Sequence, residues 1–179
     1  KKNIQEGDRC LLVSENRPEW FISDLAIMLS GGITVPAYTT YTDEDYKYLI
    51  ELFFSQADKQ DKKSIFLQWL NPNNKKTYTW EETQKNIFKL SKIIKENIKE
   101  GDRCLLVSEN RPEWFISDLA IMLSGGITVP AYTTYTEEDY KYLIEDCEPS
   151  LVIVSTNEML KKLSSTINEK DFIKKVITL

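Results

Sequence analysis

The chain has 179 residues, of which 41% are hydrophobic, and its formal net charge is −5. A chain of this length buries roughly 70% of the surface that its unfolded form exposes, which is enough for one domain with its own core. The acidic balance argues against nucleic acid as a partner. The sequence contains no histidine, which excludes mechanisms that use an imidazole of this chain as a base or metal ligand.

Basic residues occur at most in pairs, which is typical of solvated faces and turns. Examples are Lys62-Lys63, Lys75-Lys76 and Lys161-Lys162. Leu119–Tyr132 is the longest mostly apolar stretch, and it is shorter than the ~20 residues that span a bilayer. We therefore expect no transmembrane segment.

The three cysteines are Cys10, Cys104 and Cys147. They have no metal-ligand spacing and form no Cys-x-x-Cys pair, so a reduced cytoplasmic protein is expected. The chain begins with Lys1, which indicates a fragment or a processed product. No signal peptide is visible.

Two segments of the chain are almost identical. Lys1–Glu51, the first copy, aligns with Lys95–Glu145, the second copy, at a constant offset of 94 positions. The differences are Lys2/Glu96, Gln5/Lys99 and Asp43/Glu137. Repeat folds recur every 20–50 residues and keep a pattern, not a sequence. The near-identity therefore indicates a recent or deliberate duplication of one segment of a globular domain.

The repeated unit begins with a strand and a helix. In the second copy, Arg103–Ser108 is an apolar run without polar alternation, which predicts a parallel strand buried on both faces. We expect Asn110 to cap the next helix, with Pro112 in its first turn and Glu113 at the positive end of its dipole. Trp114–Leu123 is apolar almost all round, which predicts a helix buried on most sides.

A second strand and helix complete the unit. Gly125-Gly126 is expected to end the first helix, since glycine tolerates positive φ. Ile127–Tyr132 is the next predicted strand, and Thr136 opens a helix in which Tyr140 and Ile144 recur at helical spacing. The alternation of strands and helices predicts right-handed βαβ crossovers.

The stretch between the copies resembles the start of a domain. Leu52–Asp58 is predicted as a short amphipathic helix. Ser64–Leu70 and Lys75–Trp80 flank a turn-rich segment and predict a β-hairpin. Thr79-Trp-Glu-Glu82 is a capping box that opens a helix ending near Gly101. The apolar face predicted for this helix consists of Ile87, Leu90, Ile93, Ile94 and Ile98.

Three more elements follow the second copy. Leu151–Ser155 is predicted as a buried strand and Asn157–Ile167 as an amphipathic helix. Lys174–Leu179 is a last strand-like run, and because it would leave a sheet edge at the terminus, more sequence is expected downstream. The inward residues predicted for the helix are Met159, Leu160, Leu163 and Ile167.

We therefore predict an α/β fold, with a mostly parallel sheet, helices on both faces, a small N-terminal β-hairpin and one βαβα unit present twice. The predicted division is 1–51 for the first copy and 52–179 for the remaining domain, which holds the second copy at 95–145. The second copy is continuous with its flanking elements and avoids an extra loop closure, so we expect it to occupy the native place in the sheet. The first copy would then extend a sheet edge, self-associate by domain swapping, or stay loosely folded.

Several strings of residues carry a resemblance to a known family. They are an opening Leu52-Phe-Phe helix, Thr77-Tyr-Thr-Trp-Glu-Glu, Gly101-Asp-Arg-Cys-Leu-Leu-Val-Ser-Glu-Asn-Arg-Pro-Glu-Trp, Gly125-Gly-Ile-Thr-Val-Pro-Ala-Tyr-Thr-Thr and Asp146–Val154. In this order they resemble the N-terminal part of the adenylate-forming (AMP-binding) ligases, most closely the bacterial long-chain fatty-acyl-CoA ligases. The first copy departs from the family pattern, which has no such unit before its opening helix.

The resemblance implies an acyl-CoA synthetase that uses ATP, Mg and CoA to convert a fatty acid to an acyl-adenylate and then to a thioester. The family's phosphate loop, aromatic-Thr-Glu motif, ribose-binding Asp and C-terminal lysine would all lie downstream of this chain. No catalytic, cofactor-binding or metal residue is therefore assigned here, and the chain alone is expected to be inactive. The alternative is a non-enzymatic product of segment duplication with a structural or assembly role.

Local polar features have simpler explanations than ligand binding. Gly125-Gly126 follows a helix and precedes a strand, whereas anion sites need a strand, then glycine, then a helix N-terminus. Ser108-Glu-Asn110 and Tyr132-Thr-Thr-Tyr-Thr136 follow strand ends, where α/β proteins bind ligands, although capping and turn formation account for most of both. Glu137-Glu-Asp139 complements a helix dipole, and Asp118 is expected to be partly buried and structural.

Overall fold

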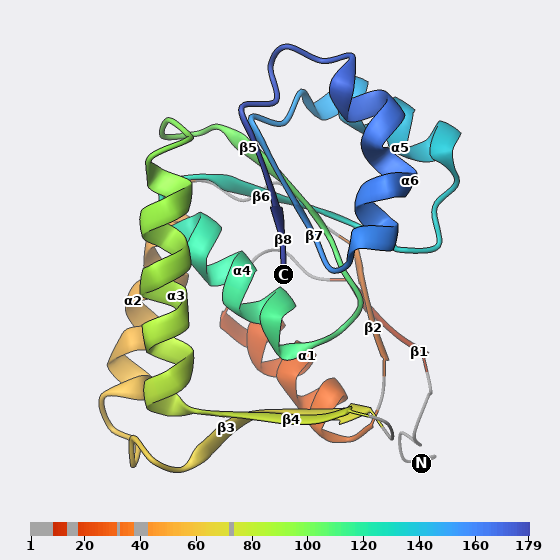
Figure 1. The fold of residues 1–179 in the computed structure, drawn as a ribbon. Helices are drawn as coiled ribbons and strands as arrows, with labels where there is room; N and C mark the ends of the chain where they lie inside the picture. The colour runs from red at the N-terminus through yellow and green to blue at the C-terminus, as the bar shows by residue number, and fades with distance from the viewer. Residues whose placement is uncertain (1–8, 14–17, 32, 38–42, 72–73) are drawn as a thin grey trace. The chain divides into compact units, whose positions relative to one another are not determined.

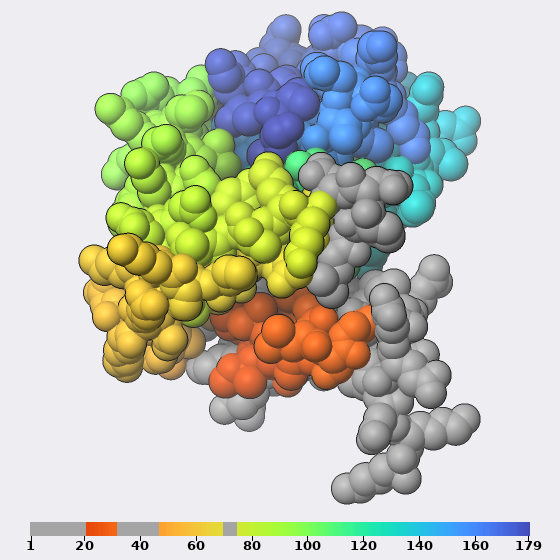
Figure 2. Space-filling view, turned by 60° about the horizontal axis from the view of Figure 1, so that its bottom comes forward, coloured from red at the N-terminus to blue at the C-terminus, as the bar shows by residue number. Residues whose placement is uncertain are grey.

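The computed structural model of the chain describes residues 9–13, 18–31, 33–37, 43–71 and 74–179 (Figure 1, Figure 2). The chain divides into two compact units, Lys1–Leu49 and Ile50–Leu179.

The first unit contains a parallel pair of strands with a helix between them. Strand β1 (Arg9–Val13) pairs with β2 (Ile33–Ala37), so that Arg9 lies opposite Ile33, and α1 (Pro18–Leu29) connects the two strands. These elements agree with the strand, helix and strand predicted for the repeated unit. The helix α1 ends before Gly31, whose φ of 80° is unfavourable for residues with a side chain.

The junction between the first copy and the rest of the chain lies inside a helix. The prediction of a separate short helix at Leu52–Asp58 was wrong in extent, because α2 runs continuously from Asp43 to Ala57. No glycine, proline or capping residue interrupts the sequence at the junction, so the backbone continues its helical hydrogen bonds across it.

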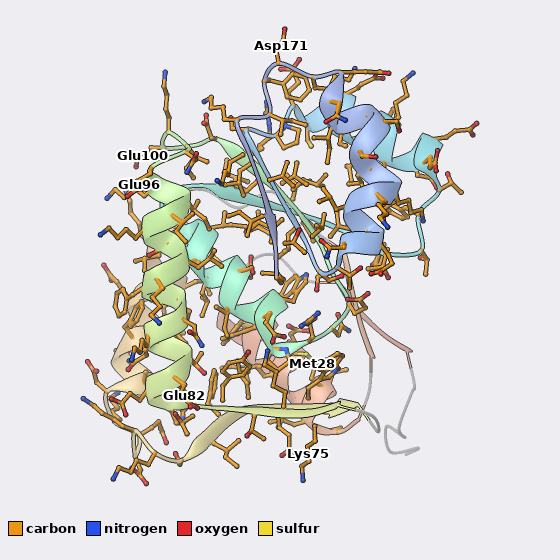
Figure 3. The ribbon with its side chains drawn as sticks, in the orientation of Figure 1. Met28, Lys75, Glu82, Glu96, Glu100 and Asp171 are labelled. Carbon is orange, nitrogen blue, oxygen red and sulfur yellow. The ribbon has the colours of Figure 1, made fainter. Side chains whose placement is uncertain are left out.

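The second unit begins with the predicted hairpin and capped helix. Strand β3 (Ile65–Asn71) is antiparallel to β4 (Asn74–Thr79), and α3 (Trp80–Lys95) follows. The Thr79 N–H donates to Glu82 Oε2 at 2.9 Å, and the Glu82 N–H donates to Thr79 Oγ1 at 3.2 Å, which confirms the capping box. Figure 3 labels Glu82 at the start of α3.

The buried face of α3 differs from the predicted one. Ile87 and Ile94 are buried as expected, but Ile93 is exposed, and the helix ends at Lys95, several residues before Gly101. Thr83 and Ser91 are the other buried residues, because they share the Ile87 side of the helix at a spacing of four. At Ser91 the neighbouring helix α4 (Pro112–Leu123) comes close, since Ser124 Oγ donates to the Ser91 carbonyl oxygen at 2.9 Å.

A four-stranded parallel sheet forms the centre of the second unit. Its strands lie in the order β6-β5-β7-β8 and all neighbouring pairs are parallel. The elements are β5 (Arg103–Val107), α4 (Pro112–Leu123), β6 (Ile127–Ala131), α5 (Glu137–Cys147), β7 (Leu151–Val154), α6 (Asn157–Asn168) and β8 (Lys175–Thr178).

Helices cover both faces of this sheet (Figure 1). On one face, Leu105 and Val107 of β5 pack with buried side chains of α5 and α6. On the other face, α4 packs against β5, β6 and α3. The core on the α5 and α6 face consists of Leu105, Val107, Ala131, Tyr140, Ile144, Val152, Val154, Met159, Leu163 and Ile167. The predicted α/β architecture is therefore confirmed.

The connection from α4 to β6 requires both of its glycines. Gly125 has a φ of +82° and ends α4 as predicted. Gly126 lies so close to its neighbours that a Cβ atom there would be 2.8 Å from Ile98 Cδ1 and 3.2 Å from Cys104 Sγ. The turn from α4 into β6 therefore has no room for a side chain at position 126.

The second copy forms part of the four-stranded sheet. Its strand β5 pairs with β6 in the register that β1 has with β2, and it also pairs with β7. Among the described residues, β1 pairs only with β2. The side chains of α4 are correspondingly more buried, since Ile116 is 5% exposed whereas the equivalent Ile22 is 59% exposed.

The equivalent isoleucines provide a matched test of this difference. We predict that Ile116→Ala lowers the free energy of unfolding by about 2–4 kcal/mol, since it removes a buried side chain from a packed helix. Ile22→Ala, in the same local sequence, should change it by less than about 0.5 kcal/mol. Urea unfolding of dilute samples, followed by circular dichroism, checks both values. Equal losses in the two variants would contradict the assignment of the second copy to the core.

Candidate functional site

The carboxyl ends of β5 and β7 lie side by side at one edge of the sheet. After β5 the chain turns to α4 on one face, and after β7 it turns to α6 on the other face. Ligands of open α/β sheets bind at such a switch in topology. The residues located there are Ser108, Glu109, Asn110, Arg111, Ser155 and Thr156.

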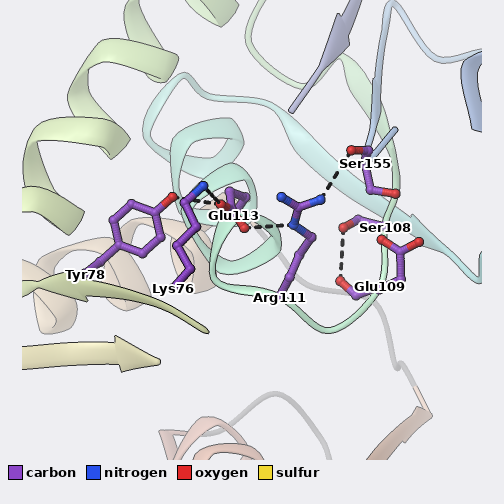
Figure 4. A network of polar contacts seen from close by, with 7 residues as sticks. All are labelled: Lys76, Tyr78, Ser108, Glu109, Arg111, Glu113 and Ser155. Atoms are coloured by element: carbon purple, nitrogen blue, oxygen red, sulfur yellow. Dashed lines mark hydrogen bonds and ion pairs between the residues drawn. The ribbon is translucent and has the colours of Figure 1, made fainter. Parts of the chain in front are cut away.

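Arg111 connects the two strand ends (Figure 4). Its Nη1 donates to the carbonyl oxygen of Ser155 at 3.3 Å, and its Nε donates to Glu113 Oε2 at 2.8 Å. The guanidinium lies 5.0 Å from the centre of the Trp69 ring, in cation–π geometry. The Arg111 side chain thus contacts three residues of the second unit, Ser155, Glu113 and Trp69.

The prediction that Asn110 caps α4 was wrong by one residue. Arg111 is the N-cap, with a φ of −133°, and its side chain makes no capping hydrogen bond. Pro112 stands at the first helical position, which it favours because it lacks an N–H, so the cap must be the residue before it. Asn110 is exposed.

Glu113 is the acceptor at the centre of the polar network. Its Oε2 accepts from Arg111, and its Oε1 accepts from Tyr78 Oη at 2.7 Å and from Lys76 Nζ. Burial alone would raise the pKa of the Glu113 carboxyl, but the hydrogen bonds from Arg111, Lys76 and Tyr78 together lower it to about 2. Glu113 is therefore ionised across the physiological range and does not serve as a proton donor.

This network joins the hairpin to the sheet. Lys76 and Tyr78 come from β4, Trp69 from β3 and Glu113 from α4. The sequence pattern indicated only a helix-dipole role for Glu113, and its hydrogen-bond partners were not predicted. Lys76 and Tyr78 share a face of β4 because side chains alternate along a strand, but nothing in the sequence indicates that this face meets α4.

The two serines at the strand ends differ in their bonding. Ser108 Oγ donates to the carbonyl oxygen of Glu109 at 3.0 Å. Ser155 is 2% exposed, and its N–H donates to the carbonyl oxygen of Val107 at 2.9 Å. Within the described residues, Ser155 Oγ has no hydrogen-bond partner. The Thr156 hydroxyl accepts from the Met159 N–H at 3.2 Å and caps α6.

Side chains of α5 and α6 hold the hydroxyl-rich segment after β6, Tyr132–Thr136, in place. Tyr140 Oη donates to the carbonyl oxygen of Tyr132 at 2.5 Å, and Lys162 Nζ donates to that of Tyr135. Burial, together with nearby Tyr135 and Glu109, raises the pKa of Tyr140 to about 12. Thr136 caps α5 and forms a capping box with Asp139, as predicted. The segment is thus a braced turn with Tyr132 half-exposed.

The remaining predicted features have structural roles. Gly125-Gly126 ends α4, Glu137 and Glu138 are exposed in the first turn of α5, and Asp118 is half-buried. Cys104 and Cys147 are free and buried. Burial raises the pKa of the Cys104 thiol to about 12 and that of Cys147 to about 11, so neither is a reactive thiolate. Cys10 lies outside the residues whose side chains are described.

The described residues do not fit a Mg–ATP site. Within them, no group of three His, Cys, Asp or Glu side chains gathers to hold a metal ion. The loop from β5 to α4, Ser108–Arg111, contains no glycine, so its backbone does not form the close phosphate cradle of nucleotide-binding loops. In the same part of the chain, no helix combines the length and apolarity needed to cross a membrane.

A family model matches the chain in two consecutive parts. The model describes AMP-binding enzymes, and it matches residues 1–52 and residues 53–179. The two matches together cover the chain, and each contains one of the near-identical segments.

Curated relatives include several acyl-CoA ligases. A long-chain-fatty-acid–CoA ligase of Mycobacterium tuberculosis, FadD15, is 32% identical over 78 residues, which are 42% of this chain and 13% of the relative. The rat long-chain-fatty-acid–CoA ligase ACSBG1 is 27% identical over 85 residues, 48% of this chain and 12% of the relative. The human mitochondrial acyl-coenzyme A synthetase ACSM3 is 26% identical over 105 residues, 57% and 18%. The chain thus spans less than a fifth of each relative.

Solved structures share the fold. The anthranilate CoA ligase AuaEII in complex with anthranoyl-AMP matches 80% of this chain and 26% of its own, with a TM-score of 0.62 and 17% identity. The N-terminal domain of FACL13 from Mycobacterium tuberculosis matches 73% and 33%, with a TM-score of 0.60 and 16% identity. At these identities the likeness concerns the fold alone.

The Glu113 network predicts a pH-dependent contribution to stability. Because the folded-state pKa of about 2 lies below the ordinary value of 4.5, the carboxylate stabilises the folded chain above pH 4.5, and this contribution is lost as the pH falls toward 2. Glu113→Gln should therefore lower the free energy of unfolding at pH 7 by about 2–3 kcal/mol, because one pKa unit corresponds to about 1.4 kcal/mol and solvent screening at the partly exposed Lys76 reduces the full value.

Urea unfolding at pH 7, 5, 4 and 3 measures this contribution. The difference between wild type and Glu113→Gln should shrink from pH 5 to pH 3. Glu137→Gln, at an exposed position in the first turn of α5, is the matched control and should change stability by less than about 0.5 kcal/mol. A wild-type to Glu113→Gln difference that stays constant over this range would show that the ionised network does not form.

Proposed function

The chain belongs to the AMP-binding enzyme family, and on that premise we propose that it is the N-terminal part of an acyl-CoA ligase. The whole protein would activate a long-chain fatty acid with ATP to an acyl-adenylate, release pyrophosphate and transfer the acyl group to coenzyme A. The observation that carries this proposal is the family match over residues 53–179, which fold into a parallel sheet with the strand order β6-β5-β7-β8.

The relatives support the choice of substrate class. FadD15 and ACSBG1 are both named long-chain-fatty-acid–CoA ligases, and both align with about half of this chain. The fold also matches a CoA ligase whose structure contains an acyl-adenylate, anthranoyl-AMP. Together these support a carboxylic acid substrate and, within that class, a long-chain acid.

In this proposal, the role of the chain is to support the site and not to catalyse. Arg111 at the strand ends is already paired with Glu113, which also accepts from Lys76 and Tyr78 of β4. A carboxylate held by three donors does not exchange protons with a substrate near neutral pH. Catalytic, nucleotide and Mg²⁺ residues would therefore come from parts of the protein outside the 179 residues.

We also propose the division of the chain into 1–51 and 52–179, with the second copy at 95–145 as the functional unit of the sheet. The pairing of β5 with both β6 and β7 supports this division. A cytoplasmic location belongs to the same proposal, and the free, buried Cys104 and Cys147 support it because reducing compartments keep thiols unpaired.

A rival proposal is a non-enzymatic protein whose two near-identical segments serve assembly. The observation that favours it is the first copy itself, which repeats a sheet-forming unit outside the four-stranded sheet. The two proposals differ in the sequence that they require after Leu179. An acyl-CoA ligase needs a phosphate loop there, whereas a non-enzymatic assembly protein does not.

Sequencing of the coding DNA past Leu179, followed by an assay, distinguishes the two proposals. The protein encoded by the complete reading frame should catalyse fatty-acid-dependent exchange of pyrophosphate into ATP, whereas the 179-residue chain should show only the rate measured without fatty acid. Reactions without fatty acid are the control for both proteins. A stop codon directly after Leu179, or the absence of exchange by the complete protein, would contradict the ligase proposal. Exchange by the 179-residue chain would contradict its supporting role.

A further inference from the structure

The four-stranded sheet contains a segment that the chain carries twice without any difference. Residues 6–42 and residues 100–136 have the same sequence, because the differing positions of the two copies all lie outside them. We call residues 6–42 the first twin and residues 100–136 the second twin. The second twin holds β5, α4 and β6, and the frame around it consists of the hairpin, α3, α5, β7, α6 and β8.

The frame contacts the second twin through residues that the first twin also has. Arg111 Nη1 donates to the Ser155 carbonyl oxygen at 3.3 Å (Figure 4), and Ser124 Oγ donates to the Ser91 carbonyl oxygen at 2.9 Å. The residues of the second twin that contact the frame include Arg103, Val107, Arg111, Glu113, Phe115 and Ser124. The residues at the equivalent positions of the first twin are Arg9, Val13, Arg17, Glu19, Phe21 and Ser30.

The first twin also has the local structure that the frame requires. Strand β1 pairs with β2 with Arg9 opposite Ile33, and β5 pairs with β6 with Arg103 opposite Ile127, in the same parallel register. The same twelve residues form the helix between the strands, as α1 and as α4. Contacts with the frame therefore do not distinguish one twin from the other.

The connectivity of the chain favours the second twin. This twin is joined to the frame at both ends, since α3 ends at Lys95 and α5 begins at Glu137. If the first twin took its place, residues 96–136 would have to close a loop between α3 and α5. Closure of a flexible loop of that length lowers the population by a factor on the order of 10² to 10³.

We propose that the frame accepts either twin, and that the first twin replaces the second one within the same chain when the second is damaged. A segment of the same chain has an effective concentration of about millimolar, so exchange within one chain exceeds exchange between chains in dilute solution. The undamaged chain holds the alternative arrangement as a minor state of about 1% or less. A substitution that weakens the second twin by more than the loop-closure factor makes the alternative arrangement dominant.

Aspartate substitutions at one equivalent pair of positions test the proposal. Ala120 on α4 is 0% exposed, so Ala120→Asp would bury a carboxylate without a partner. If the first twin takes over, this variant keeps a cooperative urea transition, and its folding constant falls only by the loop-closure factor of about 10² to 10³. Ala26→Asp, at the equivalent position of the first twin, should unfold like the wild type.

The double variant Ala26→Asp/Ala120→Asp has no intact twin and should show no cooperative transition. Leu163→Asp is the control for a buried position of the frame, which has no second version in the chain, and it should not be rescued either. Equal loss of folding in Ala120→Asp and in the double variant overturns the proposal. So does an equal retention of folding in these two variants, because it would show that the first twin plays no part.

A cysteine pair measures directly which twin adjoins β7. Leu106 lies opposite Ile153 in the pairing of β5 with β7, and Leu12 is its equivalent in the first twin. In the Ala120→Asp background, Leu12→Cys with Ile153→Cys should form a disulfide within one chain under mild oxidation, identified by peptide mapping, because neighbouring strands lie at a suitable distance. The same pair without Ala120→Asp should form it in low yield. Absence of this disulfide in the Ala120→Asp background, or its formation only between chains, overturns the proposal.

Discussion

The pairing of β5 between β6 and β7 is the constraint on which the second unit depends. Four consecutive residues of this strand, Cys104–Val107, are fully buried. Their side chains alternate between the face covered by α4 and the face covered by α5 and α6. One short strand thereby joins two cores. It also fixes where Ser108–Arg111 emerges, because the loop begins at the point where the backbone pairing with β7 ends.

The Arg111–Glu113 network extends this constraint to the hairpin. Buried charges are costly unless they are paired and hydrogen-bonded, and Glu113 has partners from β4 and from its own helix. Removal of one partner would leave another charge unpaired, so the network acts as a unit that orients the hairpin against α4. The network thereby fixes the position of the loop between β5 and α4 at this edge of the sheet.

The two near-identical segments show how far local sequence determines environment. The same twelve residues form a helix as α1 and as α4, with a strand on each side in the same register. Secondary structure and local pairing thus follow from the segment itself. Burial does not, since Ile116 is covered and Ile22 is exposed. In the second unit α4 packs against α3, and β5 pairs with β7 as well as with β6.

The sequence by itself determined the class of fold, the capping boxes at Thr79 and Thr136, the hairpin and the glycine stop at Gly125, because these depend on residues close together in the chain. It also identified the family, from strings of residues in order. Tertiary structure alone decided the Glu113 network and the continuous α2. The partners of Glu113 lie 35 and 37 residues away on β4, and no periodicity reports which face of a strand meets which helix. Contacts between distant segments depend on the packing of the whole unit, which local patterns do not encode.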